Sequence, residues 1–365
     1  MSTNDPRALG AEGFDHLVYV RLFEGCNLAC QHCFIPANPK KMTEEQLKKL
    51  PSDFSKFAQP GQTILVQWHG GEPTMLGHDV IEKAIEHWKS EYTDYKFKFG
   101  IQTNLLTYNS EWERVYKEHF DGQVGISWDP EIRLTRKGRP ETNAEFENQF
   151  WAKVEQLVSD GIEPYLVVTG TRKFFEKFQN PHDFFEMMES RGIPNGHIER
   201  LTKTGVARQY WDEIGLSNKE HSRYMLRFAR SYIDYLSKPR MPDSKPIHLS
   251  PFDGLVSSIE RMRLGGSGGS GCLSGVCDTR FHTFDASGYK KGCTALTSEV
   301  DNKNAGEQVI QIADLRFARK LRQHTCVGCP YLSICSSGCM ATDKWDESGE
   351  CSGGSILFKG IEEIV

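Results

Sequence analysis

The stretch Cys26-Asn27-Leu28-Ala29-Cys30-Gln31-His32-Cys33 decides how this sequence is interpreted. It follows the apolar run His16–Leu22, which is predicted to be a β-strand. Three thiolates this close together can hold three irons of a four-iron cubane and leave the fourth iron open. A zinc site completed by His32 or by a distant residue is the alternative, because zinc also takes cysteine and histidine ligands. On either interpretation the stretch is a metal-binding loop at the end of a strand.

The other cysteines lie far along the chain. The protein has 11 cysteines, and after Cys33 the next is Cys272, the first of eight that extend to Cys351. The N-terminal residues Met1 to Gly13 are polar and contain no apolar signal segment, so we expect a cytoplasmic protein. The cytosol keeps thiols reduced, which excludes a disulfide framework. Cysteines that serve only as small hydrophobic residues would be scattered, so this clustering indicates metal ligation.

Composition narrows the class of protein further. The chain has 365 residues, enough for about two domains, with 38% hydrophobic and 25% charged residues. Its net charge of −5 argues against a nucleic-acid partner, which would require a basic excess. No run approaches the roughly 20 apolar residues of a membrane span, so no membrane association is expected.

The first 200 residues alternate between strand and helix patterns. Six short apolar runs are predicted to be strands: His16–Leu22, Thr63–Trp68, Lys96–Thr103, Gly122–Ser127, Glu163–Thr169 and His197–Leu201. Helical patterns lie between them, at Thr43–Phe57, His78–Tyr92, Asn143–Asp160 and Asn180–Arg191. Thr43 and Gln46 have the spacing of a capping box. Such alternation predicts an α/β fold, a partial (β/α)6 barrel similar to a TIM barrel, with its active site at the carboxyl ends of the strands.

The domain organisation follows from these patterns. We expect a tail at residues 1–13, a barrel at 14–217, a helical bridge at 218–264, and a Cys-rich domain at 272–365. The Gly/Ser repeat at 265–271 has the composition of a flexible linker, either natural or engineered. The Cys-rich segment is poor in apolar residues and therefore needs a metal to fold.

Further motifs resemble the radical S-adenosylmethionine (AdoMet) superfamily. Gly70-Gly71-Glu72-Pro73 matches the GGEP turn, which in the family meets the AdoMet amino group, and it follows the second predicted strand. Gln102-Thr103-Asn104 and Ser127-Trp128-Asp129-Pro130 resemble family segments that contact the ribose and carboxylate, although Pro130 replaces the usual glycine. The resemblance implies a 4Fe–4S cluster on the three-cysteine loop. It also implies AdoMet contacts at Gly70, Gly71, Glu72, Pro73, Gln102, Asn104, Ser127 and Asp129.

Arg133 and Arg136 are additional candidates for a clamp on the AdoMet carboxylate, although solvated loop arginines are an equal alternative. In this family, one-electron cleavage of AdoMet yields a 5′-deoxyadenosyl radical that removes a hydrogen atom from the substrate. The protein binds and orients the reactants while the cofactor carries the chemistry.

The C-terminal cysteines resemble the SPASM domain, which binds two auxiliary 4Fe–4S clusters. Their spacing has the form C-x10-G-x4-C, a gap, C-x2-C-x5-C-x3-C, a gap and C, with one further cysteine upstream. By position, the first auxiliary cluster would take Cys272, Cys277, Cys293 and Cys339. The second would take Cys326, Cys329, Cys335 and Cys351. Three clusters then use every cysteine; a pair of structural zinc sites is the alternative.

The reaction is expected from the same resemblance. SPASM enzymes mostly modify peptides or proteins. Thr294 stands where anaerobic sulfatase-maturating enzymes carry a basic aspartate after the G-x4-C cysteine, and Asp278 occupies a different place. With all cysteines assigned as ligands, an epimerase with a thiol hydrogen donor is disfavoured. We therefore expect an oxidoreductase that matures a ribosomally made precursor peptide by a C–C or thioether cross-link.

The sequence leaves other functions open and predicts partner proteins. Sulfatase-type formylglycine formation, a small-molecule dehydrogenase and a non-catalytic metal-binding partner protein remain open, and the residue that accepts the proton is unknown. About thirteen residues precede the first strand, so a leader-binding module is expected on a separate protein, if one is needed. The electron donor would be of the flavodoxin or ferredoxin type.

Overall fold

A nine-stranded sheet forms the centre of the computed structural model, which describes residues 13–35, 40–135, 139–239, 245–298 and 315–365. The strand order is β7-β6-β5-β4-β3-β2-β1-β8-β9, and every neighbouring pair is parallel except β8 and β9. The strands are β1 (His16–Phe23), β2 (Thr63–Gly70), β3 (Lys96–Thr103), β4 (Gln123–Ser127), β5 (Glu163–Gly170), β6 (Asn195–Arg200), β7 (His248–Ser250), β8 (Phe281–Asp285) and β9 (Gly288–Lys291). The first six agree with the predicted strands to within two residues, which confirms the partial α/β barrel.

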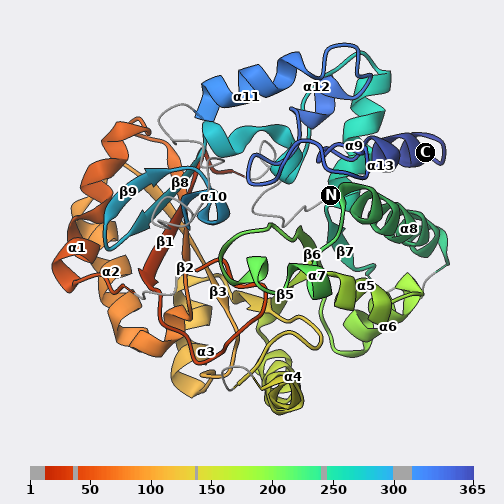
Figure 1. Ribbon diagram of the computed structural model, residues 1–365. Coiled ribbons are helices and arrows are strands. Elements are labelled where there is room, and N and C mark those ends of the chain that lie inside the picture. Colours follow the sequence, from red (N-terminus) through yellow and green to blue (C-terminus); the bar gives the residue numbers. More distant parts are fainter. Residues whose placement is uncertain (1–12, 36–39, 136–138, 240–244, 299–314) are drawn as a thin grey trace.

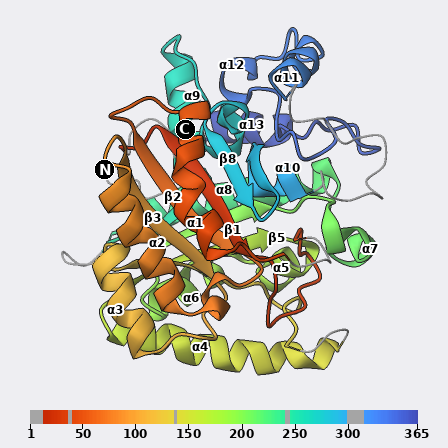
Figure 2. The same ribbon diagram turned by 90° about the vertical axis from the view of Figure 1, so that its left-hand side faces the viewer.

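Helices cover the outer face of this curved sheet (Figures 1 and 2). Around the barrel they are α1 (Glu44–Lys49), α2 (His78–Glu91), α3 (Ser110–His119), α4 (Asn143–Ser159), α5 (Arg172–Lys177), α6 (Pro181–Ser190) and α7 (Trp211–Ile214). Short 3-10 turns lie at Leu50–Lys56, Pro73–Leu76, Pro140–Thr142 and Gly205–Arg208. The predicted capping box of Thr43 and Gln46 is present at α1. Inside this layer Trp68 of β2 stacks on Trp88 of α2, and both are fully buried.

The predicted helical bridge differs from expectation. It consists of two helices, α8 (Asn218–Ser237) and α9 (Phe252–Arg263), with strand β7 between them. Pro239 follows α8 and Pro251 precedes α9, and proline is not tolerated within a helix. The bridge therefore contributes an edge strand to the barrel, where β7 pairs with β6.

The Cys-rich segment is joined to the barrel through the sheet itself. Strand β8 pairs in parallel with β1, and Figure 1 shows β8 and β9 in blue beside red β1. Arg21 of β1 is buried and donates to Asp285 of β8 at 2.5 Å. The remaining elements are 3-10 turns at Gly271–Ser274 and Val276–Asp278, and helices α10 (Thr294–Ser298), α11 (Leu315–His324), α12 (Leu332–Cys335) and α13 (Ser355–Glu362).

The Gly/Ser segment 265–271 contacts the Cys-rich part, since the Gly268 amide donates to the Ser333 carbonyl at 2.9 Å.

In the described ranges, no helix combines the length and apolar character needed to cross a lipid bilayer.

Candidate functional site

One large cavity opens at the carboxyl ends of the barrel strands. Its volume is about 1620 Å³, and its wall includes both clumps of cysteines. The lining cysteines are Cys26, Cys30, Cys33, Cys272, Cys293 and Cys339. The cavity therefore connects the loop after β1 with the C-terminal segment.

The three-cysteine loop is fixed by backbone hydrogen bonds to two other loops. The Ala29 amide donates to the Leu134 carbonyl at 2.8 Å, and the Val206 amide donates to the Cys33 carbonyl at 2.8 Å. The surrounding protein raises the pKa of Cys30 to about 12 and that of Cys33 to about 11, because burial disfavours the thiolate. Thiolates at these positions therefore need a positive partner such as a metal cluster.

The turn after β2 lies against the start of this loop. The Gly71 amide donates to the Phe23 carbonyl at 2.9 Å. A β-carbon on Gly70 would lie 2.1 Å from the Phe23 oxygen, and one on Gly71 would lie 2.3 Å from the Gly25 oxygen. Gly70 also has a φ of +141°, which side chains rarely adopt. Both glycines are thus required for this close approach, and both line the cavity.

Glu72 points away from the cavity. It is 1% exposed, and its carboxylate accepts hydrogen bonds from the Thr74 and Thr103 hydroxyls at 2.6 and 2.7 Å. The Asn104 amide also donates to it at 2.7 Å, and burial raises the pKa of Glu72. Glu72 and the buried Pro73 are absent from the cavity wall. The carboxylate therefore holds the ends of β2 and β3 together.

The predicted residues on β3 and β4 meet at the cavity. The Gln102 amide group donates to the Ser127 hydroxyl at 2.7 Å, and the Asn104 amide group donates to Asn27 Oδ1 at 2.7 Å. Gln102, Asn104 and Ser127 all line the cavity. Asn104 links the end of β3 to the cysteine loop.

Asp129 is completely buried, and its carboxylate contacts the side chains of two neighbouring residues, Arg133 and His32. Its carboxylate accepts from Arg133 Nε at 2.8 Å, pairs with Arg133 Nη2 at 2.7 Å and lies 3.3 Å from His32 Nε2. Asp129 is absent from the cavity wall, whereas Arg133 lines it and places Nη1 3.9 Å from Cys30 Sγ. Arg133 is thus the cation that the cavity presents beside the cysteine loop. Arg136, the other predicted clamp, lies outside the described residues.

Seven of the eight C-terminal thiols lie in two groups, one drawn from each of the two predicted ligand sets. The thiol of Cys293 is affected by the charges of Cys277 and Cys339. That of Cys335 is affected by the charges of Cys351, Cys326 and Cys329, and burial raises the pKa of Cys335 to about 12. Gly353 makes room for this thiol, because a β-carbon there would lie 2.4 Å from Cys335 Sγ. We call these sets group I (Cys272, Cys277, Cys293 and Cys339) and group II (Cys326, Cys329, Cys335 and Cys351). Cys272 lines the cavity together with Cys293 and Cys339.

The spacing of the thiols does not favour zinc. A tetrahedral zinc ion with Zn–S bonds of about 2.3 Å holds its sulfurs roughly 3.8 Å apart. Among the described residues, which include every cysteine, no three thiols lie within 4.8 Å of one another. A cubane binds its thiolates at separate irons and so keeps them further apart. The donor chemistry, sulfur from cysteine alone, fits iron–sulfur clusters.

Two cations that contact the auxiliary thiols were not predicted from the sequence. Arg319 of α11 donates to Cys277 Sγ of group I at 2.9 Å, and Lys344 donates to Cys326 Sγ of group II at 2.8 Å. Arg319 also donates a hydrogen bond to the Asp278 carboxylate at 3.1 Å. Asp278 is therefore paired with Arg319, and it does not line the cavity. Leu315 and Arg319 form the buried face of α11, and an arginine on the apolar side of an amphipathic helix is a signal that could have revealed this role.

A carboxylate inside the cavity was also missed. Glu199 on β6 lines the cavity, and its charge acts on the Cys293 thiol. Its Oε2 lies 3.4 Å from Nε2 of His197, which shares the inward face of the strand. The other acids of the wall are Glu24, which is paired with Arg21, and Asp121, which precedes β4 and so lies at the opposite end of the barrel.

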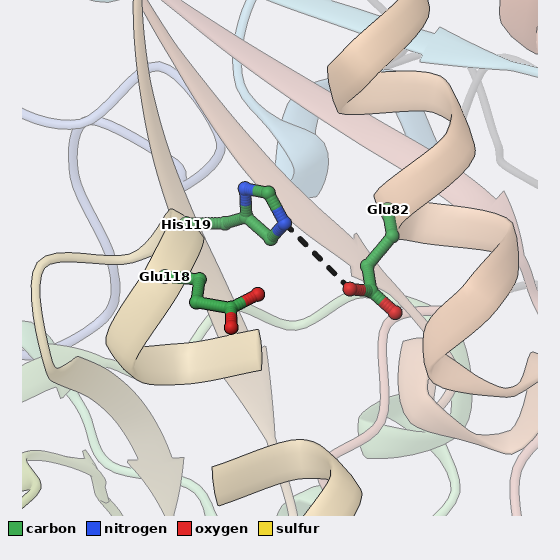
Figure 3. A group of neighbouring side chains, drawn as sticks. All are labelled: Glu82, Glu118 and His119. Carbon is green, nitrogen blue, oxygen red and sulfur yellow. Dashed lines mark ion pairs between the residues drawn. The ribbon is translucent and has the colours of Figure 1, made fainter. Parts of the chain in front are cut away.

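A separate group of possible metal ligands lies between α2 and α3. Figure 3 shows Glu82, Glu118 and His119 with their side chains turned toward one another. Arg114 donates to Glu82 at 2.7 Å and to Glu118 at 2.7 Å. This guanidinium already neutralises the carboxylates, so the group is an ion-pair network.

Comparisons with known proteins agree with this site. Residues 20–143 match the family model of the radical SAM superfamily. The chain is 23% identical over 331 residues to a cysteine-type anaerobic sulfatase-maturating enzyme from Clostridium novyi, covering 86% of this chain and 84% of that protein. It is 31% identical over 129 residues to a serine-type enzyme from Bacteroides thetaiotaomicron, covering 32% of this chain and 31% of that protein.

Solved structures show the same fold over nearly the whole chain. The structure of anSMEcpe with bound AdoMet and the Cp18Cys peptide has a TM-score of 0.67 and 19% identity, and covers 95% of each chain. Streptococcus suis SuiB bound to its precursor peptide SuiA has a TM-score of 0.55 and 12% identity, covering 90% of this chain and 73% of SuiB. These likenesses show that the chain has the fold of these proteins over nearly its whole length.

Proposed function

We propose that this protein modifies a peptide by radical AdoMet chemistry and forms an oxidative C–C or thioether cross-link in a ribosomally made precursor. The observation that carries the peptide part is the cavity. Its volume of about 1620 Å³ exceeds the roughly 300–1,000 Å³ of small-molecule sites. Its wall runs from the amino ends of the strands, at Phe14 and Asp121, to the C-terminal cysteines, and this extent favours a polypeptide segment over a small molecule as the substrate. Relatives and structural neighbours whose names mention sulfatase maturation or peptide substrates support the same class.

The cluster and AdoMet would be held at the wall formed by the strand ends. Cys26, Cys30 and Cys33 would bind three irons. The bound pair supplies a 5′-deoxyadenosyl radical, which takes a hydrogen atom from the substrate. The backbone of Gly70 and Gly71 lies open to the cavity beside the cysteine loop, and glycines let a ligand approach closely. Gln102, Asn104 and Ser127 present polar groups on the same wall.

Two predicted AdoMet contacts would act indirectly. Asp129 orients Arg133 through two of its nitrogens and leaves Nη1 for an anionic ligand group, so Arg133 would bind the AdoMet carboxylate. Glu72 positions Asn104 through its backbone amide. Binding of AdoMet would thus depend on two buried carboxylates, those of Glu72 and Asp129, that lie outside the cavity wall.

Groups I and II would each hold an auxiliary 4Fe–4S cluster through four thiolates. With every position ligated by cysteine, neither offers an open iron to substrate. We infer that they accept an electron. In an oxidative cross-link one hydrogen leaves as an atom and the other as a proton and an electron. Glu199 is the cavity carboxylate best placed to take the proton.

Formylglycine formation is the second candidate, favoured by the similarity to sulfatase-maturating enzymes over most of the chain. Two positions speak against it. Thr294 occupies the cavity wall where that family carries its aspartate, and Asp278 is engaged with Arg319.

The test is the mass of a short precursor peptide encoded beside the gene, incubated anaerobically with reconstituted protein, AdoMet and reductant. Loss of two hydrogens, located by fragmentation to two linked residues, supports the cross-link. A parallel reaction with a sulfatase peptide that carries the target cysteine tests the second candidate. Conversion of that peptide to formylglycine, with the precursor unchanged, overturns the first proposal. An external electron donor of the flavodoxin or ferredoxin type would supply the first electron, and a separate protein would bind any leader.

A further inference from the structure

The cations around the auxiliary thiols are arranged differently from those around the barrel loop. Arg319 and Lys344 each lie within 3 Å of a cysteine sulfur, Cys277 and Cys326 respectively. At the barrel loop, the nearest described cation is Arg133, whose Nη1 is 3.9 Å from Cys30 Sγ and whose other nitrogens bind Asp129. Each auxiliary group thus receives a charged donor, whereas the cation that the described residues place nearest the barrel loop is more distant and partly neutralised.

We propose that Arg319 and Lys344 raise the reduction potentials of the two auxiliary clusters and so make them the acceptors of the substrate electron. This inference rests on the proposed function, which places 4Fe–4S clusters at groups I and II. Hydrogen bonds to the ligand sulfurs and the net charge around a cluster set its potential. A positive donor stabilises the reduced cluster more, because reduction adds one negative charge.

Two further arginines strengthen the positive field between the groups. Arg200, at the end of β6, donates to the Ser352 carbonyl at 3.1 Å and is affected by the charges of Cys339 and Cys351. Arg322 of α11 donates to the Cys339 carbonyl at 3.0 Å and to the Ser352 hydroxyl at 2.7 Å. Both guanidinium groups therefore lie where the charges of one group I and one group II cysteine act on them, Cys339 and Cys351 for Arg200, and Cys339 and Cys326 for Arg322.

The electron balance of the reaction requires such an acceptor. Cleavage of AdoMet consumes one electron from the external reductant. The substrate then loses one hydrogen atom to the deoxyadenosyl radical and one proton to a base. Formation of the new bond releases the remaining electron, which reduces an oxidised auxiliary cluster. If the acceptor has a higher reduction potential than the barrel cluster, the electron stays on the acceptor. It then does not pass back through the barrel cluster to AdoMet.

The experiment is a redox titration of reconstituted full-length protein followed by electron paramagnetic resonance, without any substrate. Addition of AdoMet identifies the barrel signal, because only a cluster with an open iron binds it. Lys344→Gln should lower the potential of one auxiliary signal. Arg319→Gln should lower that of the other. We expect the oxidised-to-reduced ratio at the wild-type midpoint to rise about tenfold, which is about 59 mV for one electron.

Two controls separate this effect from a general loss of charge or structure. Lys320→Gln removes an exposed charge from the same helix as Arg319 and should shift neither signal. Lys344→Arg keeps a charged donor and should preserve the wild-type potential. Arg319 also holds Asp278 and two backbone carbonyls, so if its variant fails to assemble, the Lys344 series decides the question.

Unchanged auxiliary potentials in Lys344→Gln, with all clusters present, would overturn this inference and leave the proposed function intact. Absence of auxiliary 4Fe–4S signals from the wild-type protein would instead refute the cofactor assignment on which it rests.

Discussion

The barrel loop and the C-terminal groups hold their cysteines in opposite ways, and the loop and group I present cysteines to the cavity whereas group II does not. Cys26, Cys30 and Cys33 sit on one short loop that is held by hydrogen bonds to two other loops, and Arg133 is the cation beside them in the part of the chain that the structure describes. Groups I and II collect thiols over a long stretch of chain and surround them with Arg319, Lys344, Arg200 and Arg322. On the proposed function, this difference separates one site that binds a ligand from two sites that hold electrons.

Removal of one thiol from each region tests the difference between the two regions most strongly. Cys30→Ala should abolish formation of 5′-deoxyadenosine and lower the iron content by about a third, because one of three clusters is lost. Cys335→Ala should also lose one cluster, yet keep deoxyadenosine formation within a few-fold of wild type. Both quantities are measured by chromatography of the products and by iron analysis. Deoxyadenosine formation by Cys30→Ala would contradict the division of roles.

The next largest effect is expected at Glu199. If this carboxylate accepts the substrate proton, Glu199→Gln should slow product formation by roughly 10²- to 10⁴-fold, the usual contribution of a general base. Deoxyadenosine should still form, because hydrogen-atom removal precedes the proton transfer. The exposed Glu186 on α6 provides the control substitution Glu186→Gln. An equal loss of deoxyadenosine and product would point to a structural role for Glu199.

Arg133 tests the ligand-binding side of the comparison. Arg133→Gln should raise the KM for AdoMet about 10- to 100-fold, because a hydrogen bond between charged groups contributes roughly 1.5–3 kcal/mol. Asp129→Asn should give a smaller change in the same direction, since it loosens Arg133 without removing it. Arg114→Gln on the outer surface serves as the control. An unchanged KM in Arg133→Gln would place the AdoMet carboxylate elsewhere.

The smallest expected effect concerns the junction of the two regions. His16 of β1 and His282 of β8 share a hydrogen bond of 3.1 Å, and burial lowers the pKa of His282 to about 3. The unfolded chain takes up a proton near pH 6.5 and the folded chain does not. The free energy of unfolding should therefore fall as pH drops below about 6.5, by at most about 1.4 kcal/mol per pH unit for this group.

Denaturant unfolding between pH 7.5 and 5.5 measures this dependence, and His282→Phe should flatten it. A slope that is identical in wild type and variant would mean that other groups govern the acid sensitivity.

Much of the fold and part of the site could be predicted because their signals are local. Strand and helix periodicity located β1 to β6, and the cysteine positions show where thiols gather, while the division into two ligand sets stays a prediction from the SPASM resemblance. The prediction of a helical bridge at 218–264 was wrong for the residues of β7. This short strand is defined by its pairing with β6 and only weakly by its own sequence.

Other features depend on contacts between residues far apart in the chain. Nothing near Phe281 indicates that β8 pairs with β1, more than 250 residues away. Glu72 and Asp129 were predicted as ligand contacts from motif position, yet their side chains are buried behind the wall. Lys344 and Glu199 carry no local signal in the sequence that distinguishes them from surface charges, because the fold alone brings Lys344 to a thiol and Glu199 to the cavity.

The central claim is that one cluster serves AdoMet and two serve as electron acceptors. Mössbauer spectroscopy of protein reconstituted with iron and sulfide, together with metal analysis, tests it most directly. The account predicts about twelve irons per chain, all as 4Fe–4S clusters, and about eight after Cys26, Cys30 and Cys33 are replaced together by alanine. About four irons with two zinc ions per chain would contradict it, because groups I and II would then be structural zinc sites.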